Sequence, residues 1–111
     1  MTETDTFDTL TDQNWEKDVL GSPKPVLVDF WADWCQPCKA LVPALEAVAA
    51  HFAGRLKVGT MNVEENNDVP YKYNINRLPT LLVIKGGQVS EQRVGLISKE
   101  ELIKLLGPHI S

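Results

Sequence analysis

Cys35 and Cys38 are the residues of this sequence whose type and spacing point most directly to chemistry. They are the only cysteines among 111 residues, and Gln36 and Pro37 separate them. Two thiols this close can alternate between a dithiol and a disulfide, exchanging two electrons with another disulfide. The reactive species in that exchange is the thiolate, so the position of the pair in the fold decides how reactive it is.

The segments on either side of the cysteines predict a strand followed by a helix. Residues 26–31 (VLVDFW) form a short apolar run rich in β-branched side chains, which is typical of a buried strand. Residues 39–52 repeat apolar side chains at helical spacing, at Leu41, Leu45, Val48, Ala49 and Phe52. The pair should therefore stand at a helix start, where free N–H groups and the helix dipole favour a thiolate.

A Cys-x-x-Cys pair can also be a structural staple or half of a zinc site. A staple around so short a loop removes little entropy from the unfolded chain. Structural zinc takes four Cys or His ligands, and this sequence adds only His51 and His109, neither at finger-like spacing. The strand before the pair and the helix after it favour a redox dithiol, and no metal site is expected.

Residues 30–39 (FWADWCQPCK) resemble the active-site segment of the thioredoxin family. Val28-Asp29, residues 77–81 (RLPTL) and Val94-Gly95 match further family motifs, in the family's order, and the resemblance covers almost the whole chain. It implies an α/β thioredoxin fold, a central mixed β-sheet of about five strands flanked by about four helices. It also implies a general protein dithiol–disulfide oxidoreductase that reduces substrate disulfides. The resemblance implies recycling by a thioredoxin reductase with electrons from NADPH, the alternative being a ferredoxin-linked reductase, and this chain would bind no cofactor.

The order of the cysteines predicts a division of roles. Cys35 lies nearer the loop and is expected to be the exposed nucleophile, whereas Cys38 lies one helical turn further and is expected to be buried. The family resemblance implies the same roles, with Cys35 attacking the target disulfide and Cys38 releasing the reduced product.

Asp29 is a carboxylate within an apolar strand. Strand residues alternate in direction, so it could face solvent, but a strand covered by helices on both faces leaves no solvent side. Burial raises a carboxyl pKa and allows proton transfer near neutrality. The resemblance implies that Asp29 accepts the proton of Cys38. Where the family often has a nearby Lys, this chain has Thr60, which cannot supply a charge.

Two residues between the sulfurs are expected to tune the redox potential. Pro37 falls in the first helical turn, where its missing N–H costs little. The family usually has Gly where this chain has Gln36, a departure that places an uncharged side chain at the rim that meets partners.

Four residues are expected to bind substrate. The resemblance implies a cis bond between Leu78 and Pro79, leaving the Leu78 backbone free to pair with an extended substrate segment. Trp34 is expected at the surface beside Cys35, where a large flat ring suits a partner interface. Gly95 would permit close approach of another backbone, the alternative being a simple bend. Trp31 is expected to pack in the core.

Length and composition favour one soluble domain over residues 1–111, with 1–6 as a mobile lead-in. The polar, acidic N-terminus has no readable signal peptide, and no apolar run is long enough for a membrane span. A cytoplasmic monomer that does not contact membrane is therefore expected. Eleven basic against fifteen acidic residues give a net charge of −4, which disfavours nucleic acid as a partner.

The pattern along the chain predicts strands alternating with helices. Strands are predicted over 7–10, 26–31, 56–62, 80–84 and 88–94, with a Gly86-Gly87 hairpin before the last. Helices are predicted after Thr11 or Asp12 with Trp15 and Val19 inward, after the cysteines, briefly over 69–73, and after a Ser98–Glu101 capping box. The early strands should pair in parallel and the last pair antiparallel, giving a mixed sheet covered on both faces.

Two other functions are compatible with parts of this pattern. A disulfide oxidant or isomerase would use the same cysteines in the opposite direction, but the lack of a signal peptide disfavours it. A thioredoxin-fold binding module would not need the thiols, and the intact cysteine pair with Asp29 disfavours that alternative.

Overall fold

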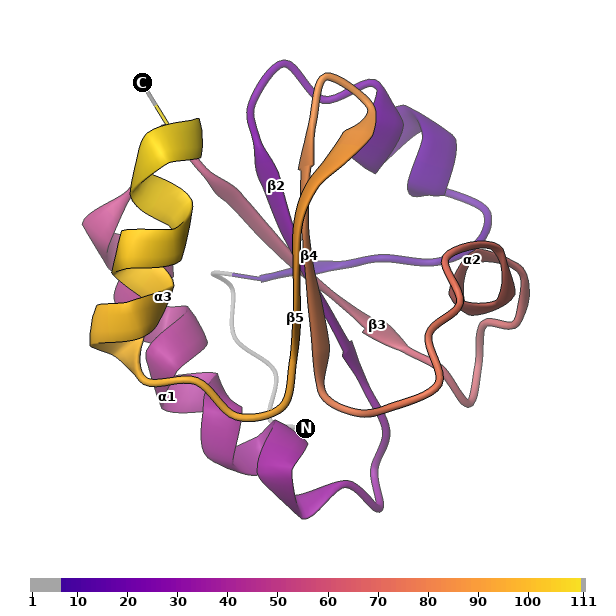
Figure 1. Cartoon of the computed structure of the whole chain (residues 1–111). Helices are drawn as coiled ribbons and strands as arrows, with labels where there is room; N and C mark the ends of the chain where they lie inside the picture. The colour runs from indigo at the N-terminus through magenta and orange to yellow at the C-terminus, as the bar shows by residue number, and fades with distance from the viewer. Residues whose placement is uncertain (1–6, 111) are drawn as a thin grey trace.

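A five-stranded mixed sheet forms the centre of the protein, in a computed structural model that describes residues 7–110 (Figure 1). Its spatial order is β1-β3-β2-β4-β5. The strands are β1 (Asp8–Thr9), β2 (Val26–Trp31), β3 (Lys57–Asn62), β4 (Thr80–Lys85) and β5 (Gln88–Val94). All five predicted strands are therefore present. The predicted lead-in over 1–6 lies outside the described residues.

The strand directions differ from the prediction at one pairing. β1 and β2 both pair with β3 in parallel, and β4 pairs with β5 antiparallel, as expected, but β2 and β4 are also antiparallel. The connection over residues 63–79 returns the chain to the end of the sheet at which it left. β3 ends at Asn62 opposite Trp31, and β4 begins at Thr80 opposite Phe30, so β4 must run in the opposite direction to β2.

Helices cover both faces of the sheet, as predicted. α1 (Gln36–His51) and α3 (Lys99–Leu106) lie on one face, while the π-helical turn η1 (Glu16–Leu20) and α2 (Asp68–Lys72) lie on the other (Figure 1). A 3₁₀ turn, η2 (Gly107–His109), follows α3.

The alternation of side chains along β2 divides the core into two clusters. Leu27 packs with residues of α1 and α3, whereas Val28 and Phe30 pack with residues of η1 and α2. Asp29 is in phase with Leu27, because side chains repeat every second residue in a strand. Its carboxylate therefore lies on the face of the sheet that α1 covers.

Two helix caps were predicted, and only one was placed correctly. The Ser98 hydroxyl accepts a hydrogen bond from the Glu101 N–H at 3.2 Å, so the capping box of α3 is confirmed. Thr11 instead closes a turn with Asn14, since η1 begins only at Glu16. Asp12 caps a different helix altogether, α2, which lies more than fifty residues further along the chain.

Candidate redox site

A disulfide joins Cys35 and Cys38 at the start of α1, with Cα atoms 5.3 Å apart. Cys35 is the N-cap residue of the helix, and its Sγ accepts a hydrogen bond from the Cys38 N–H at 3.2 Å. A hydrogen bond to sulfur and the positive end of the helix dipole both stabilise a thiolate at this position. When the disulfide is reduced, these two effects favour the thiolate of Cys35.

The predicted difference in exposure between the cysteines is wrong for the disulfide form. Cys35 is 3% exposed and Cys38 is 2% exposed, so both are buried. In this form the Cys35 sulfur is bonded to Cys38 and accepts its N–H, which places it beside the first turn of the helix. Their positions still differ, because Cys35 is the cap and Cys38 lies within the first turn of α1.

Asp29 is fully buried on β2, and burial raises the pKa of its carboxyl from 3.8 to about 7. Among the described residues, neither carboxylate oxygen has a hydrogen-bond partner. Its neighbours across the sheet register are Thr60 on β3 and Leu81 on β4, neither of which carries a charge. A carboxyl with this pKa exchanges a proton near neutral pH. The predicted burial of Asp29 is therefore present in the structure, and burial is the cause of the raised pKa.

The loop before β4 reaches the same end of the sheet as the cysteines. The peptide bond between Leu78 and Pro79 is cis, as the resemblance implied. The Pro79 carbonyl accepts a hydrogen bond from the Gly95 N–H at 2.9 Å, which ties the end of β5 to this loop. Gly95 has a φ of 95°, a conformation that residues with a side chain rarely adopt.

Gln36, Pro37 and Trp34 form the exposed rim of the disulfide. Gln36 and Pro37 are the first two residues of α1, and both are exposed. The ring of Trp34 precedes Cys35 directly and is 68% exposed. Trp31 is only partly buried, but its Nε1 is buried and has no hydrogen-bond partner among the described residues. The three rim residues carry no charge, and the exposed charges nearest to them in the sequence are Asp33 and Lys39.

Comparison with known proteins matches this arrangement to one family. The thioredoxin family model aligns with residues 6–107. This chain belongs to the thioredoxin family. It is 46% identical over 101 residues to a thioredoxin of Pseudomonas aeruginosa, covering 91% of this chain and 94% of the relative. It is 47% identical over 97 residues to a thioredoxin of Acidithiobacillus ferridurans, covering 87% of this chain and 90% of the relative.

As a thioredoxin, the protein is a dithiol–disulfide oxidoreductase that reduces disulfides of other proteins through the Cys35–Cys38 pair. Thioredoxins in general are returned to the dithiol form by a reductase. Within residues 7–110, no group of three or more His, Cys, Asp and Glu side chains is placed to hold a metal ion. In the same part of the chain, none of the helices has the length and hydropathy needed to cross a bilayer.

Two exposed apolar residues lie beside the predicted substrate site of this thioredoxin and were not predicted from the sequence. Val94 is 42% exposed and Leu96 is 55% exposed, on either side of Gly95. The one pattern in the sequence that could have indicated an exposed apolar residue is the pair Leu96-Ile97, directly before the helix cap. Neighbouring residues in an extended segment point in opposite directions, and the structure buries Ile97 and exposes Leu96.

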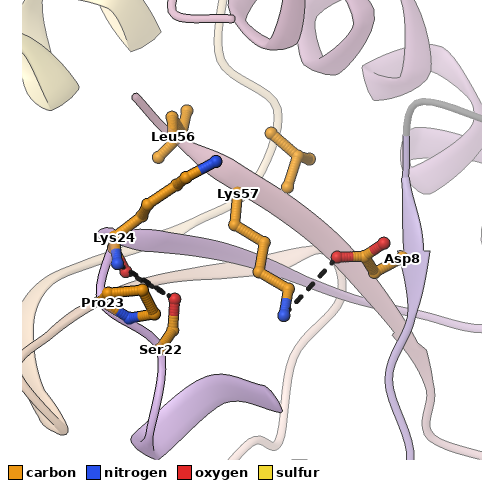
Figure 2. A pocket seen from close by; sticks show the side chains of 7 residues that line it. Asp8, Ser22, Pro23, Lys24, Leu56 and Lys57 are labelled. Carbon is orange, nitrogen blue, oxygen red and sulfur yellow. Dashed lines mark hydrogen bonds and ion pairs between the residues drawn. The ribbon is translucent and has the colours of Figure 1, made fainter. Parts of the chain in front are cut away.

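A hollow of about 370 Å³ in this thioredoxin lies at the opposite end of β2 from the cysteines (Figure 2). Lys57 lies in it, with Nζ 3.7 Å from the Asp8 carboxylate and 2.8 Å from the Asp18 carbonyl oxygen that accepts its hydrogen bond. The Ser22 hydroxyl donates to the Lys24 carbonyl at 2.9 Å. These polar groups satisfy one another, and the hollow contains none of the predicted site residues.

Proposed function

We propose that this thioredoxin reduces protein disulfides with Cys35 as attacking group, Cys38 as resolving group and Asp29 as proton acceptor. The observation that carries the proposal is the placement of the pair. Cys35 caps α1 and receives the Cys38 N–H, while Asp29 is buried with a raised pKa on the sheet face that α1 covers.

In the first step, the Cys35 thiolate attacks one sulfur of the substrate disulfide. A mixed disulfide forms between Cys35 and the substrate, and the other substrate sulfur leaves as a thiolate that takes a proton from water. In the second step, Cys38 gives its proton to the Asp29 carboxylate and attacks the Cys35 sulfur. The second substrate sulfur leaves as a thiolate that takes a proton from water, so two electrons have passed to the substrate and the Cys35–Cys38 disulfide has formed.

Asp29 suits this step because its pKa of about 7 divides it between both protonation states near neutrality. A carboxyl at its usual pKa would be a much weaker base for a thiol. The proton that Asp29 accepts must later reach solvent, and a pKa near 7 permits that return as well.

Four residues are proposed to contact the substrate backbone and side chains near the disulfide: Trp34, Leu78, Pro79 and Gly95. Their support is the shared end of the sheet and the Gly95–Pro79 hydrogen bond. Gln36 and Pro37 are proposed to tune the redox potential, since both lie in the first turn of the helix that carries the sulfurs.

The wider setting that we propose is a monomeric single domain over residues 1–111, working in the cytoplasm without nucleic acid or membrane contacts. A reductase that oxidises NADPH would return it to the dithiol form, so the protein would transfer electrons from that reductase to its substrates. The support for the compartment is that the only two cysteines form the redox pair, because disulfides of proteins in a reducing compartment are usually transient and catalytic.

The test is a coupled assay with insulin as the disulfide substrate and an NADPH-dependent thioredoxin reductase as the electron source. We expect NADPH consumption that requires both cysteines. The reduction potential against glutathione should be below that of a disulfide oxidant. A potential in the oxidant range would favour the reverse reaction. Full biological activity of a Cys35→Ser, Cys38→Ser double variant would favour a binding module instead.

A further inference from the structure

A groove of about 650 Å³ lies beside the redox site, between α1 and the loop that joins β5 to α3. In Figure 1 this loop passes alongside the first turns of α1. It is lined by Ala40, Pro43, Ala44 and Ala47 of α1 and by residues 96–99, where the loop meets the start of α3.

The floor of the groove exists because the helix carries small side chains there. Ala40, Ala44 and Ala47 are spaced by four and three residues, so they lie on one face of α1. A methyl group at each position leaves open a volume that a longer side chain would fill. An ordinary solvent-facing helix surface would carry charged or polar residues instead.

The wall of the groove is apolar and exposed. Leu96 is 55% exposed, Val94 two residues before it is 42% exposed, and Trp34 beside Cys35 is 68% exposed. These are three of the five large hydrophobic side chains that are exposed among the described residues. Large apolar side chains exposed near a reactive site are typical of an interaction surface.

The groove is continuous with the surface that any disulfide substrate must reach. Ala40 lies two residues beyond Cys38 in the same helix, and Leu96 directly follows Gly95. Gly95 is in turn held to the cis-proline loop by its hydrogen bond to Pro79. A partner whose disulfide contacts Cys35 therefore extends over the entrance of the groove.

We propose that this groove binds an apolar side chain of the disulfide substrate, three or four residues from the cysteine that reacts with Cys35. The proposal rests on the proposed function and adds a specificity element to it. Ala44 and Ala47 lie about 9 and 13.5 Å beyond Cys38 along the helix axis. An extended peptide rises about 3.3 Å per residue, so its third or fourth residue reaches this depth.

The charge of the groove indicates which residue of the substrate should follow the bound apolar side chain. Lys99 is the one charged residue among those described as lining it. A leucine-sized side chain followed by an acidic residue would fill the apolar part and pair with the ammonium group. A second copy of this chain is disfavoured as the occupant, since each copy carries a net charge of −4 and would cover its own cysteines.

The test uses synthetic peptides with a single cysteine activated as a mixed disulfide with 2-nitro-5-thiobenzoate. Attack by Cys35 on the peptide sulfur releases the coloured thiolate, and Cys38 then releases the peptide thiol. In one series of peptides a Leu stands four residues before the cysteine, and in the other series it stands four residues after the cysteine. Matched peptides carry Ser at the same positions. Burial of a leucine side chain predicts a kcat/KM for one Leu peptide about fivefold or more above its Ser partner.

The same ratio is then measured in variants. Ala47→Phe fills the far end of the groove, and its Leu-to-Ser ratio should fall to about one. Ala50→Phe is the matched control, with the same change at an exposed position of α1 outside the groove. It should keep the ratio. Because the ratio is taken within each variant, effects on folding or potential cancel. Leu96→Ser removes the wall and provides a second variant should Ala47→Phe not fold.

Three results would overturn the groove proposal. These are equal Leu and Ser rates in wild type, an unchanged ratio in both Ala47→Phe and Leu96→Ser, or a dimer in sedimentation that Ala47→Phe dissociates. If wild type reduces none of the peptides, the proposed function fails. If it reduces all of them equally, only the groove proposal fails.

Discussion

Asp29 lies directly opposite Thr60 in the register of the parallel strands β2 and β3, and neither oxygen of its carboxylate accepts a hydrogen bond from a described residue. A threonine offers no charge to offset burial. The resemblance led us to expect a lysine in this position in many relatives. The pKa of Asp29 is therefore raised by burial alone, with no cation in register to lower it.

Replacing Asp29 with Asn should stabilise the oxidised protein at pH 8. The pKa rises from 3.8 to about 7 on folding, so between these values the folded state holds a proton that the unfolded state has lost. Stability due to Asp29 thus falls as pH rises through this window, and the full penalty, up to about 4 kcal/mol, applies above pH 7. Since a buried amide also lacks partners, we expect a net gain of about 1–3 kcal/mol.

Urea denaturation of wild type and Asp29→Asn at pH 5 and pH 8 measures this gain. It should be larger at pH 8, because only part of the penalty is present at pH 5. The same variant should resolve mixed disulfides more slowly. An equal stability difference at both pH values would show that Asp29 keeps its unfolded pKa.

A lysine in place of Thr60 should lower the pKa of Asp29 by about one unit or more, because an opposite charge favours the carboxylate. Thr60 is half-buried, and the register places it on the same face of the sheet as Asp29. A carboxyl NMR titration measures the effect. Thr60→Met is the matched control, since it adds similar length without charge. Equal titration curves in the two variants would mean that the lysine turns away from Asp29.

Cys38→Ser should accumulate a stable mixed disulfide on Cys35 when the reduced variant meets insulin, since the resolving thiol is absent. Cys35→Ser should trap about tenfold less, because the helix-cap position favours the thiolate at Cys35 and not at Cys38. Intact-mass spectrometry after alkylation quantifies both adducts. Equal trapping by the two variants would refute the division of roles.

Gln36→Gly should change both the reduction potential and the rate with a thioredoxin reductase, since residue 36 lies between the sulfurs at the exposed rim. It should also cost about 0.5–1 kcal/mol, because glycine is the poorer helix former. Glu46→Gly is the control, an exposed position of the same helix away from the sulfurs. It should lose similar stability and keep the potential. If Gln36→Gly and Glu46→Gly have the same stability, reduction potential and reductase rate, Gln36 does not tune the redox site.

Asp12→Ala should destabilise the protein by about 1–2 kcal/mol through the loss of a helix cap. The Asp12 carboxylate accepts hydrogen bonds from the N–H groups of Asn67, Asp68 and Val69 at 3.0, 3.1 and 2.9 Å. Asp12→Asn keeps one acceptor oxygen and should lose less. Urea denaturation measures the free energy of unfolding, which should decrease from wild type to Asp12→Asn to Asp12→Ala. Faster amide exchange in α2 of the Ala variant would place the loss at that helix, whereas an unchanged exchange pattern would contradict it.

The sequence by itself determined the features that arise from neighbouring residues. The apolar run of β2, the helical spacing after the cysteines and the capping box of α3 are each encoded within one element, so they could be predicted from local patterns. The burial of Asp29 also followed, since a strand covered on both faces leaves no exposed position. The cis bond before Pro79 came from the family motif, because an isolated Leu-Pro pair does not specify it.

Only the tertiary structure decided which distant residues meet. Asp12 caps a helix that begins more than fifty residues later, and the antiparallel pairing of β2 with β4 depends on the path of the chain between β3 and β4. The groove likewise combines small side chains of α1 with Leu96, which follows them by about fifty residues of chain. Local propensities carry no information about such pairings. They are selected by the packing of the whole core, in which each strand takes the direction and register that bury its apolar face.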